Sequence, residues 1–98
     1  MALFKSLPDM YEKEKDGRKP NTLRKFDASD VRFADLFQGL DKFIQIKNVA
    51  TGETFIREVT DVTYWEDWCI ISWKHEEVKQ TKDLPSRTHD ALKEENEQ

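Results

Sequence analysis

The chain has 98 residues, of which 37% are hydrophobic and 37% are charged, and its formal net charge is −4 at pH 7. This length allows one domain with a small core, and no run approaches the roughly 18 apolar residues of a membrane span. The lone Cys69 excludes an intrachain disulfide. Together with the lack of an apolar signal-peptide run, this predicts a cytoplasmic protein without membrane attachment.

Residues 1–25 predict a short helix followed by a basic arm. Pro8 suits a first helical turn, Ser6 is the expected cap, and Gly17 is a typical stop. The segment carries seven basic and four acidic residues, and its glycine, proline and asparagine predict an extended loop over 17–25. The residues of this arm that could contact nucleic-acid phosphates are Arg18, Lys19, Arg24 and Lys25.

Residues 26–75 predict the folded core, and a helix opens it. Asp27 or Ser29 is the expected cap, and Gly39 is the expected end. The apolar residues recur at the spacing of one helical face, so we expect this face to pack across a sheet. They are Phe33, Leu36, Phe37 and Leu40.

Three antiparallel strands are predicted over about 42–49, 54–64 and 68–74. Gly52 supplies the positive φ of the first tight turn, and residues 66–67 form the second. The alternation of the middle strand breaks near Glu58, which predicts a β-bulge there. The fold class is therefore α+β, a three-stranded antiparallel meander packed on one or two short helices, with flexible polar termini.

A two-residue turn at 66–67 sets the register of the second hairpin. Trp65 lies opposite Trp68, and side chains then alternate between two faces. One face is predicted to join the core. The other carries both apolar and polar side chains, and the two tryptophans lie at its end. The core face comprises Val62, Tyr64, Cys69, Ile71 and Trp73. Residues 76–98 predict an acidic, largely disordered tail, with a short helix at 90–95.

The residues that carry chemistry are few. The three glycines are isolated, so no phosphate-binding loop or cofactor motif is present. Two histidines, His75 and His89, and one cysteine do not make a zinc site without further ligands. Asp61 and Cys69 fall on opposite faces of the predicted hairpin. We therefore predict no catalytic site, no metal, no cofactor and no enzymatic activity.

The hairpin tip is the predicted partner-binding site. Exposed tryptophans either stabilise a hairpin as a cross-strand pair or serve as interface anchors, and the two roles are compatible. Acidic neighbours favour a basic or amide-rich protein partner. The predicted site comprises Asp61, Trp65, Glu66, Asp67 and Trp68.

These observations favour a non-enzymatic protein-interaction module. Its small size, acidity and lack of motifs suggest an accessory protein of a phage or mobile element that binds a host protein. The apolar strand at 42–49 is expected to need a cover, which predicts homodimerisation through a sheet edge. The alternative is a nucleic-acid-associated module that uses the basic arm on phosphates and a tryptophan on a base.

Overall fold

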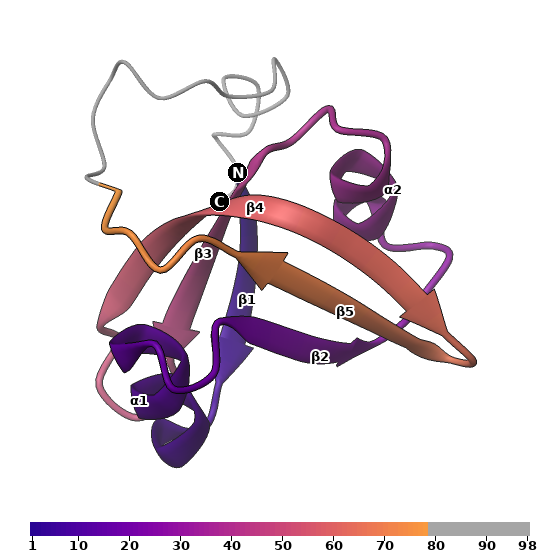
Figure 1. The fold of residues 1–98 in the computed structure, drawn as a ribbon. Coiled ribbons are helices and arrows are strands. Elements are labelled where there is room, and N and C mark those ends of the chain that lie inside the picture. The colour runs from indigo at the N-terminus through magenta and orange to yellow at the C-terminus, as the bar shows by residue number, and fades with distance from the viewer. Residues whose placement is uncertain (79–98) are drawn as a thin grey trace, which may run out of the picture.

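The structure is a computed structural model, which describes residues 1–78 and shows an α+β fold. Five strands form one curled sheet in the order β1-β3-β4-β5-β2, with two helices beside it (Figure 1). The elements in chain order are β1 (Ala2–Ser6), α1 (Pro8–Asp16), β2 (Asn21–Lys25), α2 (Val31–Phe37), β3 (Phe43–Asn48), β4 (Thr54–Trp65) and β5 (Trp68–Trp73).

The three predicted strands are present as β3, β4 and β5, but the predicted three-stranded sheet is wrong in extent. The sheet gains a strand at each edge, and it is mixed because β1 runs parallel to β3. Strand β3 is therefore internal, and β1 covers the edge for which a second copy of the chain was expected. Two segments of the predicted N-terminal region, β1 and β2, thus belong to the same sheet as the hairpin.

Strand β1 escaped prediction because its buried residues are not a run of large apolar side chains. Ala2, Phe4 and Ser6 point inward and are each at most 5% exposed, whereas Leu3 and Lys5 point outward. Because Ala2 is small and Ser6 carries a hydroxyl, the inner side lacks the large apolar residues at every second position by which a strand is recognised. Parallel pairing with a distant segment then decides its conformation.

Strand β2 replaces the end of the predicted basic arm. It pairs antiparallel with β5, with Leu23 opposite Ile70 and Lys25 opposite Trp68. Thr22 is buried at 2% exposure on the inner side. The two basic residues of this strand, Arg24 and Lys25, therefore point to opposite faces of the sheet.

The register of the β4–β5 hairpin is confirmed from Trp65 opposite Trp68 to Asp61 opposite Ser72. The β-bulge lies between Val59 and Asp61 rather than at Glu58. As a result, Trp73 pairs with Val59 rather than with Thr60, which would follow Asp61 in the predicted, regular register. The bulge bends β4, so that its first half pairs with β3 and its second half pairs with β5.

Helix α1 has the predicted extent, and Gly17 ends it with a φ of 92°. Ser6 does not cap it, because the Ser6 hydroxyl donates a 2.8 Å hydrogen bond to the fully buried Glu14 carboxylate instead. Helix α2 is capped by Asp30 rather than by Asp27 or Ser29, and the Asp30 carboxylate accepts from the Arg32 amide.

The predicted inner face of α2 is correct only in part. Phe33 and Leu36 are buried, whereas Phe37 and Leu40 are 61% and 51% exposed. The helix has only seven residues, so its contact with the core is one turn long. Leu40 lies beyond the helix, after Gly39, where the chain adopts a φ of 75°.

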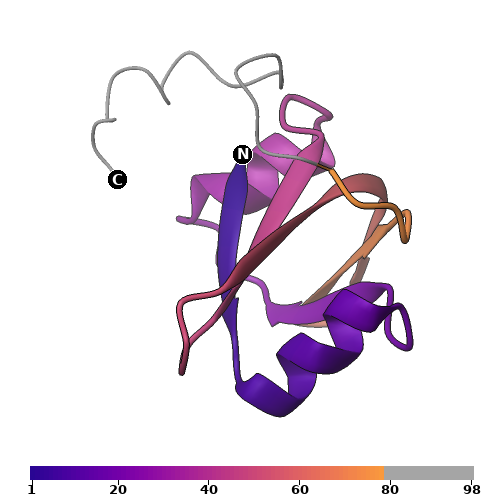
Figure 2. The same ribbon diagram turned by 90° about the vertical axis from the view of Figure 1, so that its left-hand side faces the viewer.

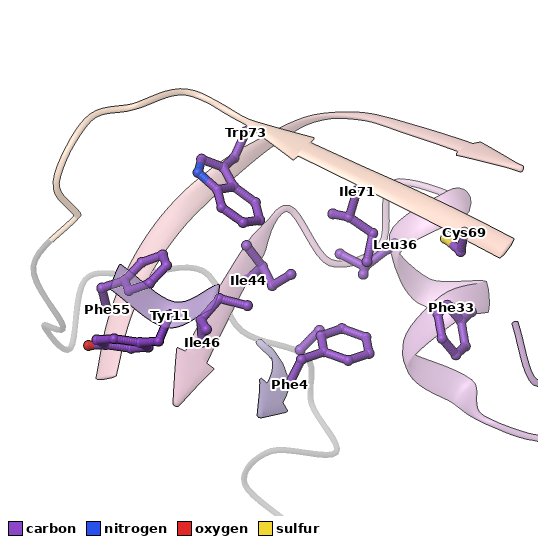
Figure 3. Packing of buried hydrophobic residues seen from close by; sticks show 11 residues of the cluster. Phe4, Tyr11, Phe33, Leu36, Ile44, Ile46, Phe55, Cys69, Ile71 and Trp73 are labelled. Atoms are coloured by element: carbon purple, nitrogen blue, oxygen red, sulfur yellow. The ribbon is translucent and has the colours of Figure 1, made fainter. Parts of the chain in front are cut away.

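The two helices lie near opposite ends of the curled sheet (Figure 2), and the core cluster takes residues from both helices and from β1, β3, β4 and β5. Tyr11 of α1 packs on Phe55 at one end, and Phe33 of α2 lies toward Cys69 at the other (Figure 3). The predicted core face of the hairpin is confirmed. Cys69, Ile71 and Trp73 are at most 4% exposed, and Val62 and Tyr64 pack against them partly buried.

The tail predicted over 76–98 and its helix at 90–95 lie, from residue 79 onward, outside the described residues. Within residues 1–78, neither helix is long and apolar enough to cross a membrane.

Candidate interaction surface at the hairpin

The outward-facing side chains of β2, β5 and the second half of β4 lie on one face of the sheet, which we call the hairpin face. Register places its side chains in rows across the three strands, because directly opposed residues share a face. The first row is Lys25, Trp68 and Trp65, and the second is Leu23, Ile70 and Thr63.

Both tryptophans of this face are open to solvent. Trp65 is 63% exposed and Trp68 is 38% exposed, and Leu23 beside them is 51% exposed. The Lys25 ammonium lies 5.4 Å from the centre of the Trp68 ring and 3.6 Å from the Asp67 carboxylate. The hairpin face thus combines a large apolar area with one cation and an acidic rim.

The acidic residues predicted at this site lie around the tryptophans. Glu66 and Asp67 form the turn, where Glu66 adopts a φ of 55°, a left-handed conformation that is uncommon outside glycine. The turn is tied to β2, because the Phe26 amide donates to the Asp67 carbonyl at 2.8 Å. Asp61 is exposed on the same side and accepts a 2.6 Å hydrogen bond from the Thr63 hydroxyl.

The four basic residues predicted to contact nucleic acid do not form one patch. Arg18 pairs with Asp16 beyond the end of α1 at 2.8 Å, and Lys19 donates to Asn21 at 3.0 Å. Burial lowers the pKa of Lys19. Of the four, only Lys25 reaches the hairpin face.

The Arg24 side chain of β2 is hydrogen-bonded to the other edge strand, β1. Its guanidinium donates to the Lys5 carbonyl at 2.6 Å and to the Ser6 hydroxyl at 2.7 Å, and so links β2 to β1. Burial lowers the pKa of this guanidinium. A second arginine, Arg32, donates to the Leu3 carbonyl. Two carbonyls on the free side of β1 are therefore occupied by side chains.

Cys69 and Asp61 lie on opposite sides of the sheet, in agreement with the predicted register. The Cys69 thiol is fully buried, and burial raises its pKa, which keeps it protonated and weakly nucleophilic. Within residues 1–78, no group of three histidine, cysteine, aspartate or glutamate side chains could hold a metal ion.

Sequence reasoning missed three apolar residues around the tip. Leu23 was assigned to a loop, Phe26 was given no role, and Phe37 was assigned to the core. All three are at least 39% exposed beside the hairpin. Their position depends on the pairing of β2 with β5 and on the shortness of α2, which no local pattern indicated.

Comparison with protein-family models and with curated proteins finds no match for this chain. The fold class is α+β, and the function is inferred below from the geometry of the surface.

Proposed function

We propose that this protein is a non-enzymatic interaction module that binds a protein partner through the hairpin face. The observation that carries the proposal is the adjacent pair Trp65 and Trp68, both exposed on a surface that also presents Leu23 and Ile70. Tryptophan is enriched among the residues that dominate binding energy. A rigid strand pair holds both rings in place before binding, which limits the entropy lost on association.

Charge favours a protein over a nucleic acid as the partner. Glu66, Asp67 and Asp61 border the tryptophans and would repel phosphates, whereas they complement a basic or amide-rich protein surface. The proximity of Lys25 to Trp68 is the feature that favours the alternative, in which a base stacks on the ring. One ammonium gives little electrostatic affinity, since nucleic-acid binding depends on many phosphate contacts.

The burial of Cys69 and its separation from Asp61 support the absence of enzymatic activity. The unpaired thiol also fits a reducing compartment such as the cytoplasm. We retain the hypothesis that the chain is an accessory protein of a phage or mobile element that acts on a host protein. This hypothesis rests on the small size and acidity of the chain. Homodimerisation through a sheet edge stays a prediction. Its interface is not β3, because β3 lies inside the sheet.

The test is site-specific photo-cross-linking in the cells that produce the protein. A benzophenone amino acid replaces Thr63, which lies on the hairpin face, or Val49, which is 49% exposed in the turn between β3 and β4. We expect a discrete protein adduct from position 63 and none from position 49. Replacement of both tryptophans by alanine should abolish the adduct.

The identified partner is then purified and titrated with the full chain. Trp68→Ala should weaken binding by about tenfold or more, whereas Val49→Ser should leave it unchanged. Equal adducts from positions 63 and 49 would refute the proposal. Quenching of tryptophan fluorescence by mixed-sequence single-stranded DNA at about 50 mM salt, lost at high salt, would favour the nucleic-acid alternative instead.

A further inference from the structure

A groove lined by aromatic rings lies between α2 and the inner side of the β4–β5 hairpin. We call it the aromatic groove, and its volume is about 530 Å³. Tyr64 stands between two phenylalanines, with ring centres 5.0 Å from Phe26 and 5.1 Å from Phe37. Phe33 lies 5.6 Å from Phe26 and is buried.

The rings meet at steep angles and leave part of their surface uncovered. The planes of Phe26 and Tyr64 are 82° apart, and those of Phe37 and Tyr64 are 56° apart. Phe26 is 39% exposed and Phe37 is 61% exposed. Such an arrangement presents several ring faces, which carry negative electrostatic potential, to one volume.

Two carboxylates line the same groove, those of Asp30 and Glu66. Asp30 is already engaged, since its oxygens accept from the Arg32 amide at 3.0 Å and from Arg32 Nε at 2.9 Å. Glu66 is exposed in the hairpin turn. Negative ring faces and an accessible carboxylate together complement an organic cation rather than an anion or a neutral apolar group.

The same protein already pairs guanidinium groups with phenylalanine rings elsewhere. Arg32 lies 4.1 Å and Arg24 lies 5.2 Å from the centre of the Phe4 ring, and Arg57 lies 4.7 Å from that of Phe55. Within residues 1–78, no cation occupies the corresponding place over the rings of the aromatic groove.

We infer that the aromatic groove binds an arginine side chain of a protein partner. The planar guanidinium stacks on Phe37 beside Tyr64 and donates hydrogen bonds to Glu66, which a compact ammonium group would do less well. This inference rests on the proposed function and deepens it, because Glu66 of the hairpin turn borders the tryptophans and also lines the groove. Its test is independent of that partner.

The experiment titrates the full chain with N-acetyl-arginine amide and, separately, with N-acetyl-citrulline amide. Citrulline has nearly the same shape as arginine and no charge. Carbon–proton spectra of the aromatic rings report binding at each ring. We expect saturable shifts of the Phe37 and Tyr64 signals with the arginine amide, and affinity about five- to thirtyfold lower for the citrulline amide.

Variants locate the binding. Phe37→Leu should abolish the Tyr64 shifts while retaining an apolar side chain, and Glu66→Gln should weaken binding without altering the groove. Val31→Ser is the matched control, because Val31 is 58% exposed on the same helix and does not line the groove. It should bind as the wild type does.

Three results would overturn the inference. Equal affinity for the two amides would make the groove merely apolar, and the absence of saturable shifts would leave it without a cation site. Unchanged shifts in the Phe37→Leu variant would place the arginine elsewhere. Because the probes are free amides, these results do not depend on whether Trp65 and Trp68 contact a partner.

Discussion

The two halves of β4 differ sharply although they belong to one continuous strand. We call residues 54–58 the closed half; they pair with β3. Three consecutive residues of the closed half are buried, namely Phe55, Ile56 and Arg57. Residues 59–65, the open half, pair with β5 and contain no buried residue. The bulge between Val59 and Asp61 separates the two halves.

The two halves of this one strand therefore differ in packing and in exposure to solvent. In the closed half, Phe55 packs on Tyr11 of α1 at 5.3 Å, and the Arg57 guanidinium donates to the Lys15 carbonyl of that helix at 3.0 Å. In the open half, Trp65 and Thr63 face solvent. The open half can therefore form new contacts without disrupting packing that already exists.

The largest expected effect is in the closed half. Phe55→Ala should lower the free energy of unfolding by about 3–5 kcal/mol, because it removes a ring that also packs on Trp73. Trp65→Ala in the open half should cost about 1 kcal/mol or less. Urea denaturation followed by far-ultraviolet circular dichroism measures both.

Similar losses from these two variants would contradict the division of β4 into two halves. A domain of this size has a stability of only about 5–15 kcal/mol, so Phe55→Leu provides a second variant with a cost below about 1.5 kcal/mol. Its loss should still exceed that of a leucine at position 65.

A smaller effect is expected where the two edge strands meet. Arg24→Met keeps the apolar stem but removes the hydrogen bonds to the Lys5 carbonyl and the Ser6 hydroxyl, and should cost about 2 kcal/mol. Amide hydrogens of β2 should exchange faster than in the wild type. Arg18→Met, which breaks an exposed pair with Asp16, is the control and should change stability little. Unaltered exchange in β2 would show that Arg24 does not hold this strand.

The smallest expected effect is at the cap of α2, the helix beside the open half. Asp30→Ala should cost about 1 kcal/mol at neutral pH. The hydrogen bonds from Arg32 hold the pKa of Asp30 below its ordinary value of 3.8. A lowered pKa means that the stabilisation is complete above that ordinary value and is lost as the pH falls through the lowered one.

Denaturation at pH 7 and at about pH 3 tests this sign. The difference in unfolding free energy between the wild type and Asp30→Ala should be larger at pH 7. A difference that does not depend on pH would mean that the carboxylate charge contributes nothing to the cap.

The β4–β5 hairpin was the most predictable part of the fold. Its residues alternate, its turn has only two residues, and both constraints act between neighbours in the chain. The pairs from Trp65 and Trp68 to Asp61 and Ser72 followed from these constraints alone. The exact site of the bulge did not, because the bend accommodates the change of partner from β3 to β5.

The edge strands were not predictable by the same reasoning. Ala2 and Ser6 are inward-facing residues of β1 that carry no apolar signal, and β2 presents the buried Thr22 beside basic residues. Both strands pair with segments more than 40 residues away. Local propensity contains no information about such partners.

The candidate site divides in the same way. Alternation and a two-residue turn were enough to predict that Trp65 and Trp68 share one face of the hairpin, apart from the face of Cys69. That Leu23 and Lys25 join this face, and that Phe26 and Phe37 line a groove on the other side, became clear from the folded chain alone. Those positions depend on the pairing of β2 with β5 and on the place where the seven-residue helix α2 packs. Both are properties of the whole packed domain.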